Sequence, residues 1–132
     1  MRAVVCKEFG PPENLIVEDV EDPSPGEGEV AVDVRAVAIT FPETLIIEDR
    51  YQFKATPPFI PGGEVAGVVS AVGPGVTDLT VGDDVLGGGG TGGFAERVAL
   101  PAKALRPLTK GLDYAEATGF GYAYGTSFYA LK

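Results

Sequence analysis

The sequence contains no histidine and a single cysteine, Cys6, among its 132 residues. Zinc sites are built mainly from His and Cys side chains, so we expect no metal site. Without an imidazole there is no Ser–His or Cys–His nucleophile and no histidine acid–base catalysis. One cysteine cannot form an internal disulfide, which agrees with a reducing compartment. Because Cys6 lies in an apolar segment, we expect its thiol to be buried and unreactive.

Positive charge is also scarce, since ten Lys and Arg residues stand against 19 Asp and Glu residues, for a net charge of −9. This charge repels nucleic-acid phosphates and anionic lipids, so neither nucleic acid nor a membrane is an expected partner. The longest uncharged stretch, residues 117–131, is shorter than the roughly 20 residues that a spanning helix needs. Charge follows the initial Met too soon for a secretory signal. We therefore expect a soluble, cytoplasmic protein.

Glycine and proline, by contrast, are abundant and spread along the chain, with 19 and 11 residues. Their distribution is typical of many short strands joined by tight turns. The clearest strand is expected over residues 29–39, where Val30, Val32 and Val34 alternate with other side chains. Further strands are expected over residues 2–8, 15–20, 64–73, 94–100 and 104–108, and residues 81–86 are expected to form a turn that leads into another strand. The sequence therefore predicts a mostly β domain of the barrel or sandwich type.

Two segments carry helix signals. Residues 42–48 begin with a proline, which the first turn of a helix tolerates. Asp113 is followed three residues later by Glu116, a pattern typical of a helix start, and we expect a helix over residues 114–131. Three glycines inside it each cost about 1 kcal/mol relative to alanine, so this helix needs tertiary packing or close backbone contact. We divide the chain into a β domain, residues 1–112, and a connecting helix, residues 113–132.

The run Gly87–Gly93 contains the pattern G-x-G-x-x-G twice. A dinucleotide-binding loop with this pattern needs a helix that opens directly after it. Residues 94–100 instead alternate as a strand does, so we interpret the run as a flexible hairpin connection.

Several short motifs follow one another in order along nearly the whole chain. They are Met1-Arg-Ala-Val-Val, Gly10-Pro-Pro-Glu-Asn-Leu, Ala38-Ile-Thr-Phe-Pro-Glu, Pro61-Gly-Gly-Glu-Val-Ala-Gly, Val72-Gly-Pro-Gly-Val, Val81-Gly-Asp-Asp-Val, Gly92-Gly-Phe-Ala-Glu and Tyr122-Ala-Tyr-Gly-Thr-Ser-Phe-Tyr-Ala-Leu. This series resembles the medium-chain dehydrogenase/reductase superfamily, and within it the zinc-independent NADPH:quinone oxidoreductases of the zeta-crystallin type. Zinc alcohol dehydrogenases carry a His ligand where Gly63 stands here, and the cysteines of their structural zinc lobe are absent as well.

The resemblance implies a GroES-like, partly open β-barrel with short helices. Residues 1–112 would be the substrate-binding, catalytic domain, and residues 113–132 would lead into a Rossmann domain that this chain lacks. In such proteins hydride passes from NADPH or NADH to a quinone or an α,β-unsaturated carbonyl compound. We expect this chain alone to be inactive, with no metal, and the resemblance is compatible with a homodimer.

The resemblance also assigns candidate site residues. Thr40 and Glu43 fall where quinone reductases usually have Asn and Asp beside the nicotinamide and the substrate. Tyr51 matches a tyrosine that lines the substrate cleft, and Thr126 matches a residue near the nicotinamide. We therefore expect Thr40, Glu43 and Tyr51 to bind substrate and Thr40 and Thr126 to bind cofactor, and we assign no catalytic residue. The structural alternatives are that Thr40 merely ends a strand and that Tyr51 packs in a loop.

The sequence departs from the family pattern at two further positions. Asp49 stands where Gly is usual, and Asp84 stands where Arg is usual. A second hypothesis is a stand-alone GroES-like module that binds or oligomerises without catalysis. It predicts that aromatic side chains of the last helix are partly exposed, since a contiguous apolar patch marks a partner surface. These side chains are Phe120, Tyr122, Tyr124, Phe128 and Tyr129.

Overall fold

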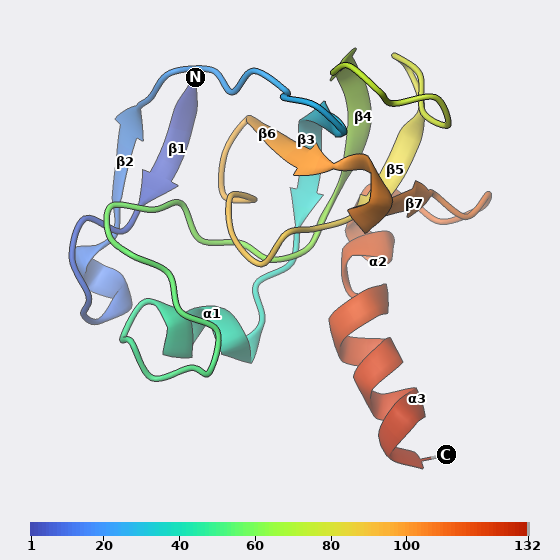
Figure 1. Ribbon diagram of the computed structural model, residues 1–132. Coiled ribbons are helices and arrows are strands. Elements are labelled where there is room, and N and C mark those ends of the chain that lie inside the picture. The colour runs from blue at the N-terminus through green and yellow to red at the C-terminus, as the bar shows by residue number, and fades with distance from the viewer. Residues whose placement is uncertain (132) are drawn as a thin grey trace.

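The computed structural model describes residues 1–131, except for the side chains of Tyr122 and Tyr124 (Figure 1). Its strands are β1 (Arg2–Val5), β2 (Ile16–Asp19), β3 (Glu29–Val37), β4 (Val65–Val72), β5 (Asp84–Gly87), β6 (Arg97–Pro101) and β7 (Leu105–Pro107). Its helices are η1 (Pro12–Asn14), α1 (Phe41–Ile46), η2 (Ala102–Ala104), α2 (Tyr114–Thr118), η3 (Phe120–Tyr124) and α3 (Gly125–Leu131). The prediction of a mostly β, GroES-like domain with short helices is confirmed.

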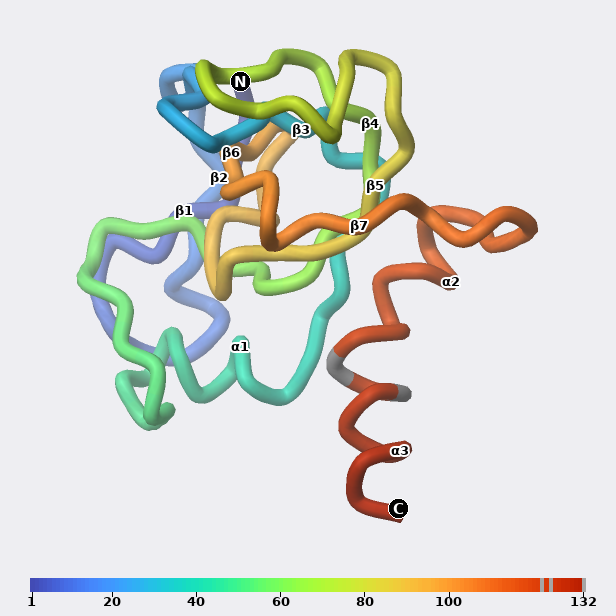
Figure 2. The backbone as a smooth tube through the Cα atoms, turned by 45° about the vertical axis from the view of Figure 1, so that its right-hand side comes forward, coloured from blue at the N-terminus to red at the C-terminus, as the bar shows by residue number. Residues whose placement is uncertain are grey.

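Five strands form one antiparallel sheet in the order β6-β3-β4-β5-β7, which curls into a half-barrel. Strands β1 and β2 form a separate antiparallel pair. This pair is joined to the larger sheet where the Val4 N–H donates to the Phe94 carbonyl at 2.8 Å. Both views show α1 and α3 below the sheet, with α3 pointing away from it (Figures 1 and 2).

The core lies inside the curled sheet and is made largely of valines. Val30, Val32, Val65, Val69 and Val85 are each at most 2% exposed. The strand expected over residues 29–39 is confirmed as β3, although Ala31 between Val30 and Val32 is also buried, so burial does not alternate there. Each fully buried valine contributes roughly 1.5–3 kcal/mol relative to exposure.

The connecting segment differs from the single helix expected over residues 114–131. The N-cap is as expected, because the Asp113 carboxylate accepts from the Glu116 N–H at 2.7 Å and Glu116 reaches back to the Asp113 N–H at 3.1 Å. After Gly119, however, α2 gives way to the π-helical turn η3 before α3 begins. The start of the segment packs on the sheet, where Ala117 is fully buried. Glycines lower helix propensity, so the backbone follows tertiary contact here and not the α-helical repeat.

The glycine run is also different from the expected hairpin. It joins β5 to β6, and these strands are separated in the sheet by β3 and β4. The run crosses the end of the half-barrel and bonds to the segment Ile60–Gly62, with N–H groups of Gly92, Gly93 and Phe94 donating at 2.6, 2.9 and 2.9 Å. Strand β6 and no helix follows it, so the helix that a dinucleotide-binding loop requires is absent from this part of the described chain.

Two smaller expectations concern Cys6 and the start of β5. The burial expected of Cys6 is confirmed, since it is 1% exposed, and burial raises the pKa of its thiol, which keeps it protonated and unreactive. A turn at Val81 and Gly82 leads into β5, which begins at Asp84, so the turn and strand expected over residues 81–86 are confirmed. Within residues 1–131, every helix falls short of the length and apolar character needed to cross a bilayer.

Candidate functional site

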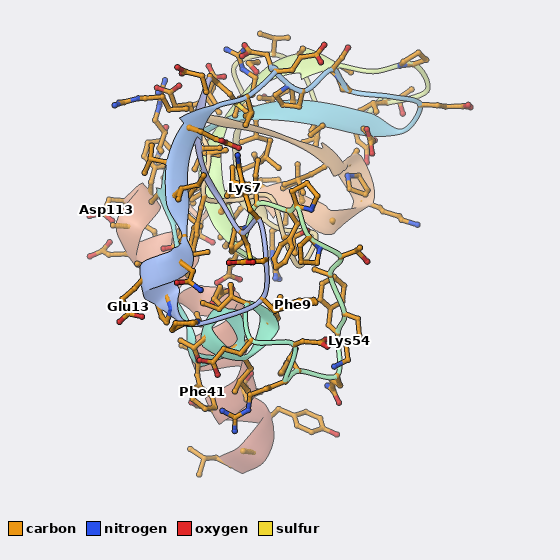
Figure 3. The ribbon with its side chains drawn as sticks, turned by 90° about the vertical axis from the view of Figure 1, so that its left-hand side faces the viewer. Lys7, Phe9, Glu13, Phe41, Lys54 and Asp113 are labelled. Carbon is orange, nitrogen blue, oxygen red and sulfur yellow. The ribbon has the colours of Figure 1, made fainter. Side chains whose placement is uncertain are left out.

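A pocket of about 490 Å³ lies between the start of α1 and the connecting helix. It is lined by Ile39, Thr40, Phe41, Pro42, Tyr51, Ala123 and Thr126. A single cavity is thus lined by three residues that the sequence predicted for the site: Thr40, Tyr51 and Thr126. Figures 1 and 2 show α1 at the height of η3 and the start of α3. Figure 3 places Phe41 at this end of the molecule.

The lining of this pocket is apolar apart from three hydroxyl groups, and it carries no charged side chain. A hollow of similar volume, about 590 Å³, instead surrounds the N-terminus, and Asp22, Asp33, Arg35, Glu96 and Arg97 line it. Several of these charges pair with one another: Arg97 contacts Asp33 at 2.7 Å and Asp22 at 2.9 Å. Apolar walls with a few convergent polar groups are typical of small-molecule sites, which favours the pocket beside α1.

Thr40 is held at the pocket wall by Glu43. Thr40 has extended backbone at the N-cap of α1, and its N–H donates to Glu43 Oε2 at 2.7 Å. Its hydroxyl also donates to that oxygen. The other oxygen, Glu43 Oε1, accepts from the Gly63 N–H at 3.1 Å. Because the Thr40 hydroxyl proton is engaged with Glu43, this hydroxyl can serve a ligand only as an acceptor.

Glu43 itself lies behind the wall and is only 6% exposed. The structure therefore places it as the support of Thr40 and not among the residues that line the pocket. Its carboxylate accepts three hydrogen bonds, and such charge-assisted bonds are stronger than neutral ones. The longer side chain of Glu, compared with the usual Asp, reaches both Thr40 and the Gly63 N–H.

Tyr51 and Thr126 contribute the other two hydroxyl groups. Tyr51 is half-buried in the loop after α1, whereas Thr126 is exposed on α3. In the described part of the chain neither hydroxyl forms a hydrogen bond, so both are available to a ligand. The apolar rim is open to solvent, with Ile39 83% and Phe41 73% exposed.

Residues 61–67, which sequence reasoning did not place in the site, contact the residues behind both walls of the pocket. Residues 61–67 are all buried; residues 61–63 contact the glycine run, and residues 65–67 begin β4. Gly63 holds Glu43, and the carboxylate of Glu64 lies against Gly121 of η3. The Pro-Gly-Gly-Glu motif, residues 61–64, is the sequence signal for this segment.

Metal ligation is not supported by the residues that the structure describes. Among them, no group of three or more Asp, Glu or Cys side chains is arranged to hold a metal ion. Gly63 offers only its backbone, and its N–H is already bonded to Glu43.

The two departures from the family pattern have structural explanations. Asp49 has a φ of 58°, a left-handed conformation that favours glycine. Asp84 accepts a hydrogen bond of 2.5 Å from the Tyr114 hydroxyl and so ties α2 to β5. The pKa of Tyr114 is raised by this bond, because ionisation would place two negative charges side by side.

Comparisons with known proteins agree with this architecture. Residues 26–110 match the family described as the alcohol dehydrogenase GroES-like domain. The chain is 41% identical over 133 residues to a quinone oxidoreductase-like protein 2 homolog from Nematostella vectensis, covering 99% of this chain and 36% of that protein. It is 35% identical over 133 residues to the quinone oxidoreductase of Homo sapiens, covering 99% of this chain and 40% of that protein.

Solved structures give the same result. A probable oxidoreductase from Mycobacterium abscessus superposes with a TM-score of 0.92 at 39% identity, over 98% of this chain and 42% of that one. The quinone oxidoreductase from Thermus thermophilus, whose structure was also solved with NADPH, gives a TM-score of 0.84 at 39% identity, over 99% of this chain and 40% of that one. The chain therefore spans about two fifths of the length of these relatives.

Proposed function

Because the chain belongs to the alcohol dehydrogenase GroES-like domain family of the medium-chain dehydrogenase/reductase superfamily, we propose that it is the substrate-binding domain of a zinc-independent, NADPH-dependent oxidoreductase. The proposed substrates are quinones and α,β-unsaturated carbonyl compounds. The observation that carries the proposal is the convergence of Thr40, Tyr51 and Thr126 on one apolar, uncharged pocket.

The pocket fits a planar, uncharged ring. Phe41 and Tyr51 offer aromatic surface, and Ile39 and Pro42 complete an apolar wall. Of the three hydroxyls, Thr40 can accept from a carboxamide, and Tyr51 and Thr126 can donate to a carbonyl oxygen. A donor aimed at that oxygen stabilises the negative charge that develops when the carbonyl compound is reduced.

The residues present fit only the nicotinamide end of the cofactor. Thr40 and Thr126 would contact it, and NADPH when bound would supply the hydride. The glycine run does not open a helix, so a pyrophosphate finds no helix N-terminus there. We therefore expect the isolated chain to bind NADPH with a dissociation constant above the micromolar range. Calorimetric titration checks this, and micromolar binding would contradict it.

The direct test of the function is NADPH oxidation by the complete gene product, with a naphthoquinone and with an enone as acceptors. We expect activity with at least one of them, and none with either would refute the proposal. Tyr51→Phe removes one donor and should lower kcat/KM by about tenfold or more. Tyr129→Phe is the matched control, because Tyr129 lies outside the pocket lining and is 83% exposed.

A stand-alone binding module remains the second candidate because one observation favours it. Phe120, Phe128 and Tyr129 are 52%, 71% and 83% exposed, which confirms that part of the expectation. The side chains of Tyr122 and Tyr124 lie outside the described residues. Light scattering tests the module: a monomer that binds no apolar dye argues against it.

A further inference from the structure

We propose that Glu64 and Gly121 are positioning residues that set the width of the pocket, because the adjacent residues Gly63 and Glu64 support its two opposite walls. The inference deepens the proposed function and rests on it for the choice of acceptors. Its structural part concerns the distance between α1 and α3 and can be tested without catalysis.

The first wall depends on Gly63. The Gly63 N–H donates to Glu43 Oε1 at 3.1 Å, and Glu43 Oε2 accepts from the Thr40 N–H at 2.7 Å. Thr40 begins α1, so this chain of two hydrogen bonds joins the start of the helix to the buried segment. Thr40 contributes a hydroxyl group to this wall.

The second wall depends on Glu64. A Cβ atom added to Gly121 would lie 1.9 Å from Glu64 Oε2 and 3.1 Å from Glu64 Cδ. The backbone of η3 therefore rests directly on the carboxylate, at a separation that no side chain at position 121 permits. Ala123 and Thr126, which line the pocket, follow two and five residues later on the same continuous segment.

The backbone of the segment between the walls is firmly held, so a clash at Gly121 must be relieved by the Glu64 side chain or by the connecting helix. The Gly93 N–H donates to the Gly62 carbonyl at 2.9 Å, and the Phe94 N–H donates to the Pro61 carbonyl at the same distance. A Cβ on Gly88 would lie 1.7 Å from the Gly63 carbonyl oxygen, so the glycine run packs directly against this backbone. Glu64 is itself 5% exposed. Because burial leaves the Glu64 side chain little space to swing into, we expect a methyl group at position 121 to displace the connecting helix outwards.

The test compares Gly121→Ala with Gly125→Ala in the complete gene product. Gly125 is a matched control, since its added Cβ would lie 3.6 Å from the nearest atom, an ordinary contact. Spin labels on cysteines introduced at Thr44 of α1 and Ser127 of α3, both exposed, measure the separation of the walls, and buried Cys6 stays in place. We expect a longer distance in Gly121→Ala and an unchanged distance in Gly125→Ala.

Acceptor selectivity gives the second measurement. With quinones of one, two and three fused rings, Gly121→Ala should lower kcat/KM for the one-ring quinone by about tenfold to a hundredfold relative to the three-ring quinone, mainly through KM, because small displacements at a site have effects of this size. Adding Glu64→Asp, which shortens the carboxylate side chain by one methylene, should bring the label distance and the selectivity back toward the wild-type values. A general loss of stability would not change the ratio between acceptors.

The outcomes separate this proposal from the function. Identical distances and identical selectivity in the two alanine variants overturn it. A longer distance in Gly121→Ala, with no quinone or enone reduced even by the wild type, supports the positioning and refutes the function. If Gly121→Ala does not fold, Glu64→Asp alone tests the same contact: a shorter label distance supports the proposal, and an unchanged one overturns it.

Discussion

The valine core and the support of the pocket are both buried, but they are held by different kinds of contact. In the core, Val30, Val32 and Val85 pack without any polar group and stabilise the fold through the area that they bury. Beneath the pocket, a carboxylate, two N–H groups and several glycines fix positions through directional bonds and close backbone contact. Burial alone therefore does not distinguish residues that stabilise the protein from residues that shape its site.

The largest expected effect belongs to the core. Val32→Ala should lower the free energy of unfolding by about 2–4 kcal/mol, because it removes buried methyl groups and leaves a cavity. It should leave the KM for a quinone unchanged. Urea unfolding and steady-state kinetics check both parts, with Val17→Ala as control, since Val17 is 68% exposed. A changed KM in Val32→Ala would mean that the valine core and the pocket are coupled, which contradicts the separation of stability from site geometry.

A smaller loss of stability with a larger loss of function is expected at Glu43. Glu43→Ala leaves the buried Gly63 N–H without its acceptor and should cost about 1–3 kcal/mol. It also releases Thr40, so KM should rise. Glu43→Gln retains the shape and one acceptor oxygen and should show smaller changes in both quantities. Chemical unfolding and acceptor titration measure them, and an unaltered KM in Glu43→Ala would argue against the role of Glu43 as the support of Thr40.

The ion pairs around Arg97 allow a test that depends on pH. The pKa of Asp33 is lowered, chiefly by its hydrogen bond to Arg97, and the pKa of Asp22 is lowered chiefly by its hydrogen bond to the N-terminal ammonium group. A lowered carboxyl pKa stabilises the fold above the unfolded value of about 3.9, and this contribution is lost as the pH falls through the folded value. Arg97→Gln should therefore lower Tm at pH 7, and its difference from the wild type should shrink below about pH 4.

The control for this test is Arg50→Gln, which breaks only the exposed pair with Glu48. Its Tm should stay close to that of the wild type at both pH values. A constant deficit of Arg97→Gln at every pH would show that Arg97 acts by packing. The network would then resemble the valine core more than the hydrogen-bonded support of the pocket.

The smallest effect is expected at Asp49. Its φ of 58° is strained for a side chain that is not glycine, so Asp49→Gly should stabilise the protein by about 0.5–1 kcal/mol. The loss of its exposed pair with Lys54 offsets part of this gain. Asp78→Gly is the control and should not stabilise, since Asp78 is not among the residues with positive φ. Thermal unfolding of both variants checks the prediction, and a lower Tm for Asp49→Gly would contradict it.

Local features of this protein were predictable from the sequence because they depend on neighbours along the chain. The strand that contains Val30 and Val32, the cap formed by Asp113 and Glu116, and the burial of Cys6 all follow from residue type and spacing. The absence of histidine excluded imidazole catalysis for any fold. The resemblance to a family pointed to Thr40, Tyr51 and Thr126, but it could not say that Glu43 lies behind the wall.

Only the tertiary structure decided how distant segments meet. The glycine run matched a nucleotide-binding pattern, yet in the fold it packs against Ile60–Gly62, because β5 and β6 are not neighbours in the sheet. The connecting helix breaks at Gly119, where its own propensity is weak and contact with Glu64 fixes the backbone at Gly121. Composition and spacing determined the class of the domain, since they act locally. The pocket depends on long-range packing. The Glu64 carboxylate fills the space that a side chain at Gly121, 57 residues later, would need.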